Sequence, residues 1–183
     1  MLINGAYSTG KTTLLQSCVD LLRSGGRDVI GLDETARHCP FPLNRDQSFL
    51  STQWLIHRQI SREIESFSEE NILIIDRGIP DIFAHYLETC DRLGTTSPEI
   101  EVLVDFLIIW CNTYDLVITT EIDQVVDIID DGLRIPDKRY RELMGQYNIS
   151  ALSRLMRRSV TLPRSVQSDS ELLHKFIVET IIT

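Results

Sequence analysis

The stretch Gly5-Ala6-Tyr7-Ser8-Thr9-Gly10-Lys11-Thr12 constrains the fold of this chain more than any other part of the sequence. It matches the pattern G-x-x-x-x-G-K-[ST], in which a glycine-rich turn points successive backbone N–H groups at phosphate oxygens. Gly5 and Gly10 supply the backbone freedom that such a turn requires. An apolar run at residues 1–4 precedes the turn, and residues 11–22 carry leucine and valine at helical spacing. The stretch therefore predicts a phosphate-binding P-loop between a buried strand and a helix.

Positions within this loop have distinct predicted tasks. The Lys11 ammonium is a point charge for the β- and γ-phosphates of a nucleotide, and the Thr12 hydroxyl is a hard oxygen ligand for the Mg²⁺ that accompanies them. Free backbone amides at the start of the following helix add to phosphate binding. The predicted nucleotide-binding residues are Gly5, Ala6, Tyr7, Ser8, Thr9, Gly10, Lys11, Thr12 and Thr13.

Strand and helix signals alternate along the rest of the chain. The clearest strand is Asn71–Asp76, a continuous apolar run of the kind expected when helices cover both faces of a sheet. Apolar residues at helical spacing mark a long helix from about Gln47 to Phe67. This alternation predicts an α/β fold of three layers, with a parallel sheet between helices, in a single domain over residues 1–183. The other expected strands are residues 28–32, 114–120 and 157–162, and the other expected helices include residues 99–112 and 170–182.

Acidic residues follow two of these strands, where the ligands of an open parallel sheet bind. Asp76 is expected near Mg²⁺, directly or through water, or as the group that accepts the proton of an attacking hydroxyl. Glu34 and Arg37 are candidates to hold a substrate hydroxyl and a phosphate or carboxylate of the substrate. The alternative interpretation is that Asp33 caps a helical turn and Glu34 lies in solvent.

Other polar residues are candidates for the substrate site. Arg77 is a planar donor suited to a phosphate or to fixing the acid beside it. Asp81 could hold a substrate hydroxyl, or only favour the N-terminus of the next helix electrostatically. Gln53 and Trp54 could reach a ring in the pocket, although such residues more often belong to the core and its rim. The histidines lack metal-ligand spacing and are expected to be structural or at the surface; they are His38, His57, His85 and His174.

The charged segment 130–141 contains glycine and proline and runs into a helical stretch. Mobile flaps over phosphates have this composition, because arginines brought in on closure neutralise charge while water is excluded. We therefore expect a lid over about residues 130–150, with Arg134 and Arg141 as its cations. The alternative interpretation is an ordinary solvated loop.

Composition limits the class of partner. The formal net charge of −9 disfavours a nucleic-acid-binding surface. The four cysteines stand singly, which suits a reducing compartment, and no signal peptide is recognisable. The longest apolar run, near residues 106–110, is too short to cross a bilayer. We therefore expect a cytoplasmic protein with a small-molecule substrate, without nucleic acid or membrane as partner, that could pair as a homodimer.

These segments together resemble a family of small P-loop kinases. The chain is similar to the nicotinamide riboside kinase domain of bacterial NAD-regulator proteins and to its stand-alone AAA-type relatives, and its Asp76-Arg77 pair is closer to nucleoside and thymidylate kinases. The segments that carry the resemblance are Gly5–Thr12, Glu34 with Arg37, Asp76-Arg77-Gly78 with Asp81 and Tyr86, and Asp131-Gly132-Leu133-Arg134 with Asp137 and Arg141.

The resemblance implies a P-loop NTPase fold with five parallel strands in the order 2-3-1-4-5 and a lid that carries arginines. It also implies transfer of the γ-phosphoryl group of ATP to a small hydroxyl substrate. By position, the catalytic residues would be Lys11, Asp76, Glu34, Arg134 and Arg141, and the metal ligands Thr12 and Asp76. The substrate-binding candidates are Glu34, Arg37, Gln53, Arg77 and Asp81.

The sequence thus predicts an ATP-dependent phosphotransferase that acts on a hydroxyl or phosphate of a nucleoside, a nucleotide or a nicotinamide riboside-like molecule. ATP and Mg²⁺ are the expected cofactors. ATP is preferred to GTP because Thr119 to Asp123 do not supply the N-K-x-D motif that recognises guanine. The alternative is a regulatory ATPase or nucleotide-sensing module whose state is read by a partner protein. Nucleotide binding without catalysis is disfavoured, since Lys11, Thr12 and Asp76 are all present.

Overall fold

The computed structural model describes residues 1–122 and 135–182, in which five parallel strands form one sheet. The strand order is β2-β3-β1-β4-β5, which confirms the predicted order. Leu2 of the central strand pairs in register with Ile75 on one side and Val117 on the other. The strands are β1 (Leu2–Asn4), β2 (Val29–Leu32), β3 (Ile72–Asp76), β4 (Val117–Thr120) and β5 (Val160–Leu162).

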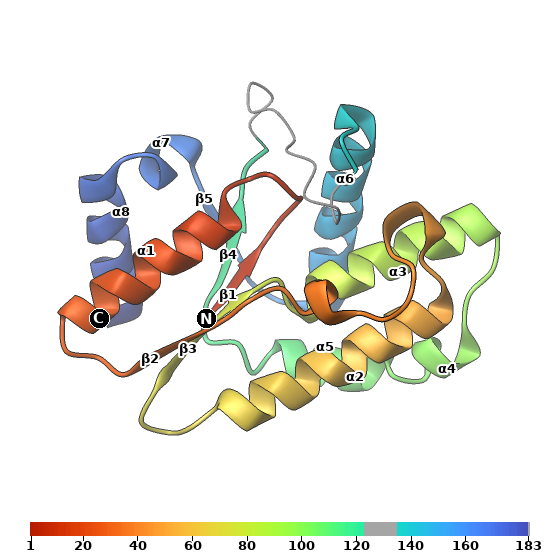
Figure 1. Ribbon diagram of the computed structural model, residues 1–183, viewed down its shortest axis with the longest axis horizontal. Coiled ribbons are helices and arrows are strands. Elements are labelled where there is room, and N and C mark those ends of the chain that lie inside the picture. The colour runs from red at the N-terminus through yellow and green to blue at the C-terminus, as the bar shows by residue number, and fades with distance from the viewer. Residues whose placement is uncertain (123–134, 183) are drawn as a thin grey trace.

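Helices cover both faces of the sheet, so the molecule has the three predicted layers. Figure 1 shows α1 and α8 on one side of the sheet and α2, α3 and α6 on the other. The helices are α1 (Lys11–Ser24), α2 (Phe49–Ser66), α3 (Ile79–Leu93), α4 (Pro98–Glu101), α5 (Val104–Cys111), α6 (Lys138–Leu155), α7 (Arg164–Gln167) and α8 (Ser170–Ile177). Shorter helical turns are η1 (Thr35–His38), η2 (Asn44–Asp46) and η3 (Val178–Ile182).

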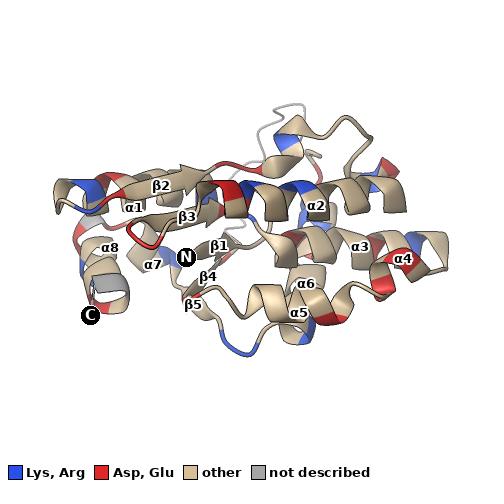
Figure 2. Cartoon of the chain, turned by 90° about the horizontal axis from the view of Figure 1, so that it is seen from below, with Lys and Arg blue, Asp and Glu red and all other residues tan. Residues whose placement is uncertain are grey.

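Alternation along β1 assigns its side chains to opposite faces of the sheet. Ile3 packs with Ile118 of β4 and with Leu14 of α1, in a cluster that α8 completes. Leu2 instead packs in the cluster that includes Leu152 of α6. Figure 2 shows the strands between these two groups of helices.

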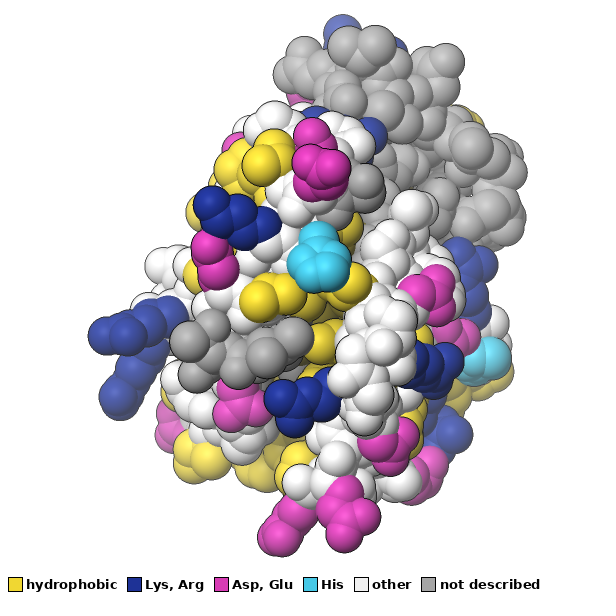
Figure 3. Space-filling view, turned by 90° about the vertical axis from the view of Figure 1, so that its left-hand side faces the viewer, with side chains coloured by type: hydrophobic (Ala, Val, Ile, Leu, Met, Phe, Trp, Pro, Cys, Tyr) yellow, Lys and Arg dark blue, Asp and Glu magenta, His cyan; other side chains and the backbone are white. Residues whose placement is uncertain are grey.

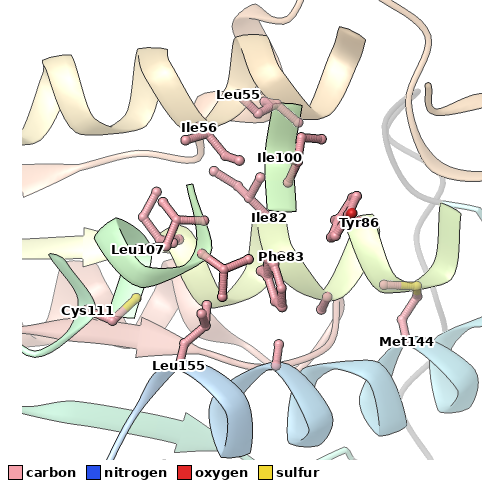
Figure 4. Close-up of a cluster of buried hydrophobic side chains, with 14 of the residues drawn as sticks. Leu55, Ile56, Ile82, Phe83, Tyr86, Ile100, Leu107, Cys111, Met144 and Leu155 are labelled. Carbon is pink, nitrogen blue, oxygen red and sulfur yellow. The ribbon is translucent and has the colours of Figure 1, made fainter. Parts of the chain in front are cut away.

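A second core lies among the helices on the α3 side, away from the sheet. Figure 4 shows Phe83 and Tyr86 of α3 at its centre, with Ile56 of α2, Leu107 of α5 and Leu155 of α6 around them. All five side chains are buried. This packing holds α2 and α3 in fixed positions, and both helices carry side chains of the site described below.

Local signals explain where several helices begin and end. Ser48 caps α2 through a capping box with Ser51, so α2 starts two residues later than predicted. Asp137 caps α6 by accepting hydrogen bonds from the N–H groups of Arg139 and Tyr140. The predicted single helix over residues 99–112 is instead two helices, α4 and α5.

The predicted lid is only partly observable. Arg134 and the rest of residues 123–134 lie outside the described residues. Residues 138–150 belong to α6, which packs against α3 and buries Tyr140 and Met144 in the core. This part of the segment is therefore the expected helical stretch, packed against α3, and its role as part of a lid stays a prediction.

Charged side chains of both signs are interspersed on the surface near α1 and α8, as Figure 3 shows. Cys18, Cys39, Cys90 and Cys111 are free thiols. Within residues 1–122 and 135–182, no helix has both the length and the apolar character needed to cross a membrane.

Candidate active site

The P-loop joins β1 to α1 through a strongly turned backbone. Gly5, Ser8 and Gly10 have φ values of 137°, 58° and 80°. A Cβ atom at Gly5 would lie 2.6 Å from Oγ1 of Thr120, so glycine is required there for space as well as for conformation. Thr9 fastens the loop to β4, because its hydroxyl lies 2.6 Å from that of Thr120. The loop is therefore held in a shape that presents amides and the N-terminus of α1 to an anion.

The Lys11 side chain is almost fully buried in this loop. Its Nζ donates a hydrogen bond to the carbonyl oxygen of Ala6 at 2.5 Å. Burial, reinforced by the nearby Arg77 guanidinium, lowers the pKa of Lys11 to about 7. A buried ammonium beside another cation is costly, and an anion bound at the loop would relieve that cost.

Oxygen ligands for a divalent cation lie side by side at the end of β3. The Thr12 hydroxyl donates to Oδ2 of Asp76 at 2.6 Å. Oδ1 of Asp76 and Oγ of Ser8 are enclosed and have no hydrogen-bond partner among the described residues. The Thr12 hydroxyl and the Asp76 carboxylate match the preference of Mg²⁺ for hard oxygen ligands. The Ser8 hydroxyl can donate a hydrogen bond to a phosphate oxygen.

Arg77 joins two carboxylates beside the loop. Its Nε lies 2.8 Å from Oε1 of Glu34, and its Nη1 lies 3.5 Å from Oδ1 of Asp81. The backbone of Arg77 is left-handed, with φ of 64°, directly after the β3 carboxylate. Burial raises the pKa of Asp81 to about 6, although Arg77 opposes that shift. Asn4 supports Asp81 from β1 by donating its amide to Oδ2 at 2.5 Å.

Two adjoining cavities meet at this cluster. The first, called the loop cavity, is lined by Ser8, Gly10, Lys11, Thr12, Thr13, Glu34, Asp76 and Arg77. The second, called the α3 cavity, is lined by Tyr7, Glu34, Thr35, Ala36, Leu43, Asn44, Gln47, Leu55, Gln59, Arg77, Asp81, Ile82 and His85. Glu34 and Arg77 line both cavities, so a molecule in one cavity would face a molecule in the other across this pair.

Hydrogen bonds fix part of the wall of the α3 cavity. Gln59 accepts from the Thr35 hydroxyl at 2.5 Å and donates to Glu63 at 2.7 Å. The buried Glu63 carboxylate also accepts from Trp110 and Tyr114, and burial raises its pKa. This chain of bonds holds the Gln59 amide in one orientation at the cavity surface.

The structure brings most of the predicted site residues together. Lys11, Thr12, Glu34, Asp76 and Arg77 line the loop cavity. Asp81 lies in the α3 cavity, where Arg77 contacts it, rather than only at the surface of a helix N-terminus.

Other predicted residues lie elsewhere. Gln53 lines neither cavity, because it lies on a different face of α2 from Gln59. The Arg37 side chain is 40 % exposed and reaches Glu34 only at 3.9 Å, outside both cavity linings. Arg141 lies on α6 and is 1 % exposed, and its role as a lid cation stays a prediction.

Sequence reasoning missed five polar side chains of the α3 cavity: Thr35, Asn44, Gln47, Gln59 and His85. His85 lies one helical turn after Asp81, so the i, i+4 spacing on α3 was a usable signal. Gln59 lies in the same register with Glu63 on α2. Gln47 lies just before the capping residue of α2, and its position depends on a loop that the sequence pattern does not determine.

Comparisons with known proteins agree with this geometry. A family model described as an AAA domain matches residues 1–168. Among solved structures, the chain is similar to deoxyadenosine kinase from M. mycoides, determined with the products dCMP and a flexible dCDP bound. The two chains are 13% identical, the TM-score is 0.61, and the match covers 99% of this chain and 97% of that one. No protein of curated function matches the sequence. The P-loop, the strand order and the family match together show that the chain belongs to the AAA domain family of P-loop proteins, with a nucleoside kinase-like fold.

Proposed function

We propose that this protein is an ATP-dependent kinase that transfers the γ-phosphoryl group to a hydroxyl of a nucleoside-like small molecule. The observation that carries the proposal is the meeting of the loop cavity and the α3 cavity at Glu34 and Arg77. A phosphate donor in the first cavity and a hydroxyl acceptor in the second would be held close together, as in-line transfer requires.

The loop cavity supplies the donor side of this reaction. Its backbone amides and Lys11 would bind the β- and γ-phosphates, with Ser8 as a further hydroxyl donor. Thr12 and Asp76 would hold Mg²⁺, which when bound would neutralise charge on the phosphate oxygens. Because the loop is fixed to β4 through Thr9, these groups need little rearrangement during the reaction.

Glu34 is the proposed general base. It is the carboxylate that lines both cavities, and the Arg77 Nε at 2.8 Å fixes its orientation. Asp76 lines only the loop cavity of the two and accepts a hydrogen bond from Thr12, which suits a metal ligand better than a base. The proton of the acceptor hydroxyl would therefore pass to Glu34.

Charge in the α3 cavity favours a hydroxyl over a phosphate as the accepting group. Among the described residues that line the α3 cavity, the charged ones are the carboxylates of Glu34 and Asp81 and the Arg77 guanidinium between them, so this lining carries a net negative charge when both carboxylates are ionised. A dianionic phosphate beside it would be repelled, whereas a neutral nucleoside or a cationic one such as nicotinamide riboside would not. Gln47, Gln59 and His85 offer uncharged polar groups for such a molecule.

An ATP-consumption assay with product identification tests the proposal. The panel contains deoxyadenosine, deoxycytidine and nicotinamide riboside, together with the corresponding 5′-monophosphates. We expect a nucleoside of the panel to be converted to its monophosphate, and we expect the monophosphates themselves to remain unchanged. Lys11→Ala should abolish transfer while the circular dichroism spectrum stays that of the folded protein, because only a phosphate-binding charge is removed.

Two results would contradict this proposal. ATP hydrolysis that no small molecule of the panel changes, but that a protein extract raises, would instead support the regulatory ATPase. Turnover by Lys11→Ala at the wild-type rate would show that the loop does not act in phosphoryl transfer.

A further inference from the structure

We propose that His85 binds the acceptor directly, through a hydrogen bond at its ring nitrogen Nδ1, and thereby selects which acceptors are phosphorylated. This inference rests on the proposed kinase function and adds a specificity-determining residue to it. It starts from a polar atom that the protein encloses beside the α3 cavity without giving it a partner.

The position of His85 places it in the α3 cavity. It lies on α3 at i+4 from Asp81, so the two side chains share one face of the helix, and both line the cavity. The neighbouring residues Phe83 and Tyr86 point into the second core (Figure 4). Because this packing fixes the rotation of α3, the His85 ring is presented to the cavity by a rigid element.

The hydrogen bonding of His85 is incomplete. Nδ1 is enclosed and makes no hydrogen bond to any of the described residues. Other polar side chains of the cavity are committed: Gln59 bonds Thr35 and Glu63, and the Tyr7 hydroxyl donates to the carbonyl oxygen of Asp137 at 3.0 Å. An enclosed polar atom without a partner is costly, and a bound acceptor with a matching group would remove that cost.

The ring is uncharged at physiological pH. Burial, with a further contribution from Arg77, lowers the pKa of His85 to about 4, although Glu34 opposes the shift. A neutral imidazole has one donor and one acceptor nitrogen. His85 therefore suits an uncharged polar group, such as a ring nitrogen, an amine or a carbonyl of a nucleobase. An acceptor without such a group would leave Nδ1 unsatisfied and would be discriminated against.

Substitutions that separate the two ring nitrogens test this inference. His85→Phe keeps a ring of similar size and removes both nitrogens. His85→Asn places an amide near the position of Nδ1, whereas His85→Gln places it near that of Nε2. The matched control is His57→Phe on the exposed surface of α2. The wild type and these variants are assayed with deoxyadenosine, deoxycytidine and nicotinamide riboside, and calorimetry measures binding of the same nucleosides without ATP.

We expect His85→Phe to raise the KM for the nucleoside that the wild type phosphorylates about tenfold, and to raise its Kd by the same factor. Tenfold is the ratio expected for the loss of one hydrogen bond to a buried group. KM for ATP and kcat should stay within about twofold, because the loop cavity is unchanged. His85→Asn should recover most of the affinity for the nucleoside, whereas His85→Gln should resemble His85→Phe. The control His57→Phe should resemble the wild type. Should His85→Phe fail to fold, the comparison of His85→Asn with His85→Gln decides the question.

Wild-type affinity for nucleosides in a folded His85→Phe, or equal affinities in the Asn and Gln variants, would overturn the role of His85 and leave the kinase proposal standing. A wild-type protein that neither binds nor phosphorylates any of the three nucleosides would overturn both. These failures are therefore distinguishable.

Discussion

The Arg77 guanidinium connects the two sides of the candidate site at the scale of single residues. It lies against Glu34 from the β2 end and Asp81 from α3, and it immediately follows Asp76, which contacts Thr12. Acidic side chains from two separate segments thus contact one cation, and a third carboxylate precedes that cation in the chain. This arrangement permits a division of labour in which Asp76 serves the metal and Glu34 serves the acceptor hydroxyl.

We expect Glu34→Gln to lower kcat about 10²- to 10⁴-fold, the range for loss of a general base. The glutamine keeps the size of the side chain and an oxygen that can accept from Arg77, so KM for ATP should change little. Steady-state kinetics with the preferred nucleoside measures the effect. Glu65→Gln is the control, because Glu65 lies on the solvent side of α2 and should leave kcat unchanged. A kcat of Glu34→Gln near that of the wild type would assign the base to another group.

Site residues that belong to a sequence motif could be predicted, and site residues whose position depends on tertiary packing could not. Lys11, Thr12 and Asp76 follow from the P-loop and from an acid at a strand end, and these positions meet in the loop cavity. Gln59 lines the α3 cavity and Gln53 does not, because the face of α2 that borders the cavity depends on how α2 packs against α3. The burial of Arg141 likewise depends on the packing of α6 against α3, which the sequence pattern does not reveal.

At the scale of elements, the close approach between β4 and the P-loop fixes the shape of the loop. Gly5 lies at φ of 137°, and a Cβ there would meet both Oγ1 and the backbone of Thr120. Any side chain at this position would push the loop away from β4 and change the direction of its amides. The contact with β4 therefore determines the conformation of the P-loop backbone.

The matched pair Gly5→Ala and Gly26→Ala tests this. Gly26 also has a positive φ, of 78°, but nothing lies within 4 Å of its would-be Cβ. We expect Gly26→Ala to cost only the conformational strain, about 1–2 kcal/mol of unfolding free energy. Gly5→Ala should cost more and also weaken ATP binding at least about tenfold. Chemical denaturation and nucleotide titration measure the two effects. Equal behaviour of the two variants would mean that the contact with β4 does not shape the loop.

Strands were more predictable than helix ends. The apolar run of β3 and the strand, glycine turn and helix around the P-loop carry strong local signals, and the five expected strands are all observed. The break between α4 and α5 has no such signal, because residues 102–103 contain neither glycine nor proline. Apolar residues on both sides of that break predict one continuous helix, and Ile100 and Leu107 both pack into the second core from the two separate helices.

At the scale of the whole molecule, hydrophobic cores on both sides of the sheet support a site that is itself unfavourable for stability. The largest lie on the α1 side of the sheet and among α2, α3, α5 and α6, and a smaller one holds Leu2 against Leu152 of α6. Between them the protein buries an ammonium at Lys11, a carboxylate at Asp81 and an unpartnered imidazole nitrogen at His85. Such groups are retained at functional sites at a cost in folding free energy.

Lys11→Met should therefore stabilise the nucleotide-free protein near pH 7, by about 1–4 kcal/mol, the range for replacing buried charges with apolar groups. The pKa of Lys11 is about 7 in the folded protein, against 10.5 in the absence of the fold. Between these values the unfolded chain binds more protons, so the unfolding free energy of the wild type rises with pH. The advantage of Lys11→Met should thus be largest near pH 7 and shrink as the pH approaches 10.

Denaturant unfolding at several pH values, read as the difference between wild type and variant, measures this because other titrating groups cancel in the difference. Lys175→Met is the control: its side chain is 69% exposed, and it should change stability by no more than about 0.5 kcal/mol at any pH. Saturating ATP should reverse the order of stability, since only the wild type gains binding energy from the ammonium. If Lys11→Met proves less stable than the wild type without nucleotide, with no dependence on pH, then the buried ammonium stabilises the fold and its role in phosphate binding needs another explanation.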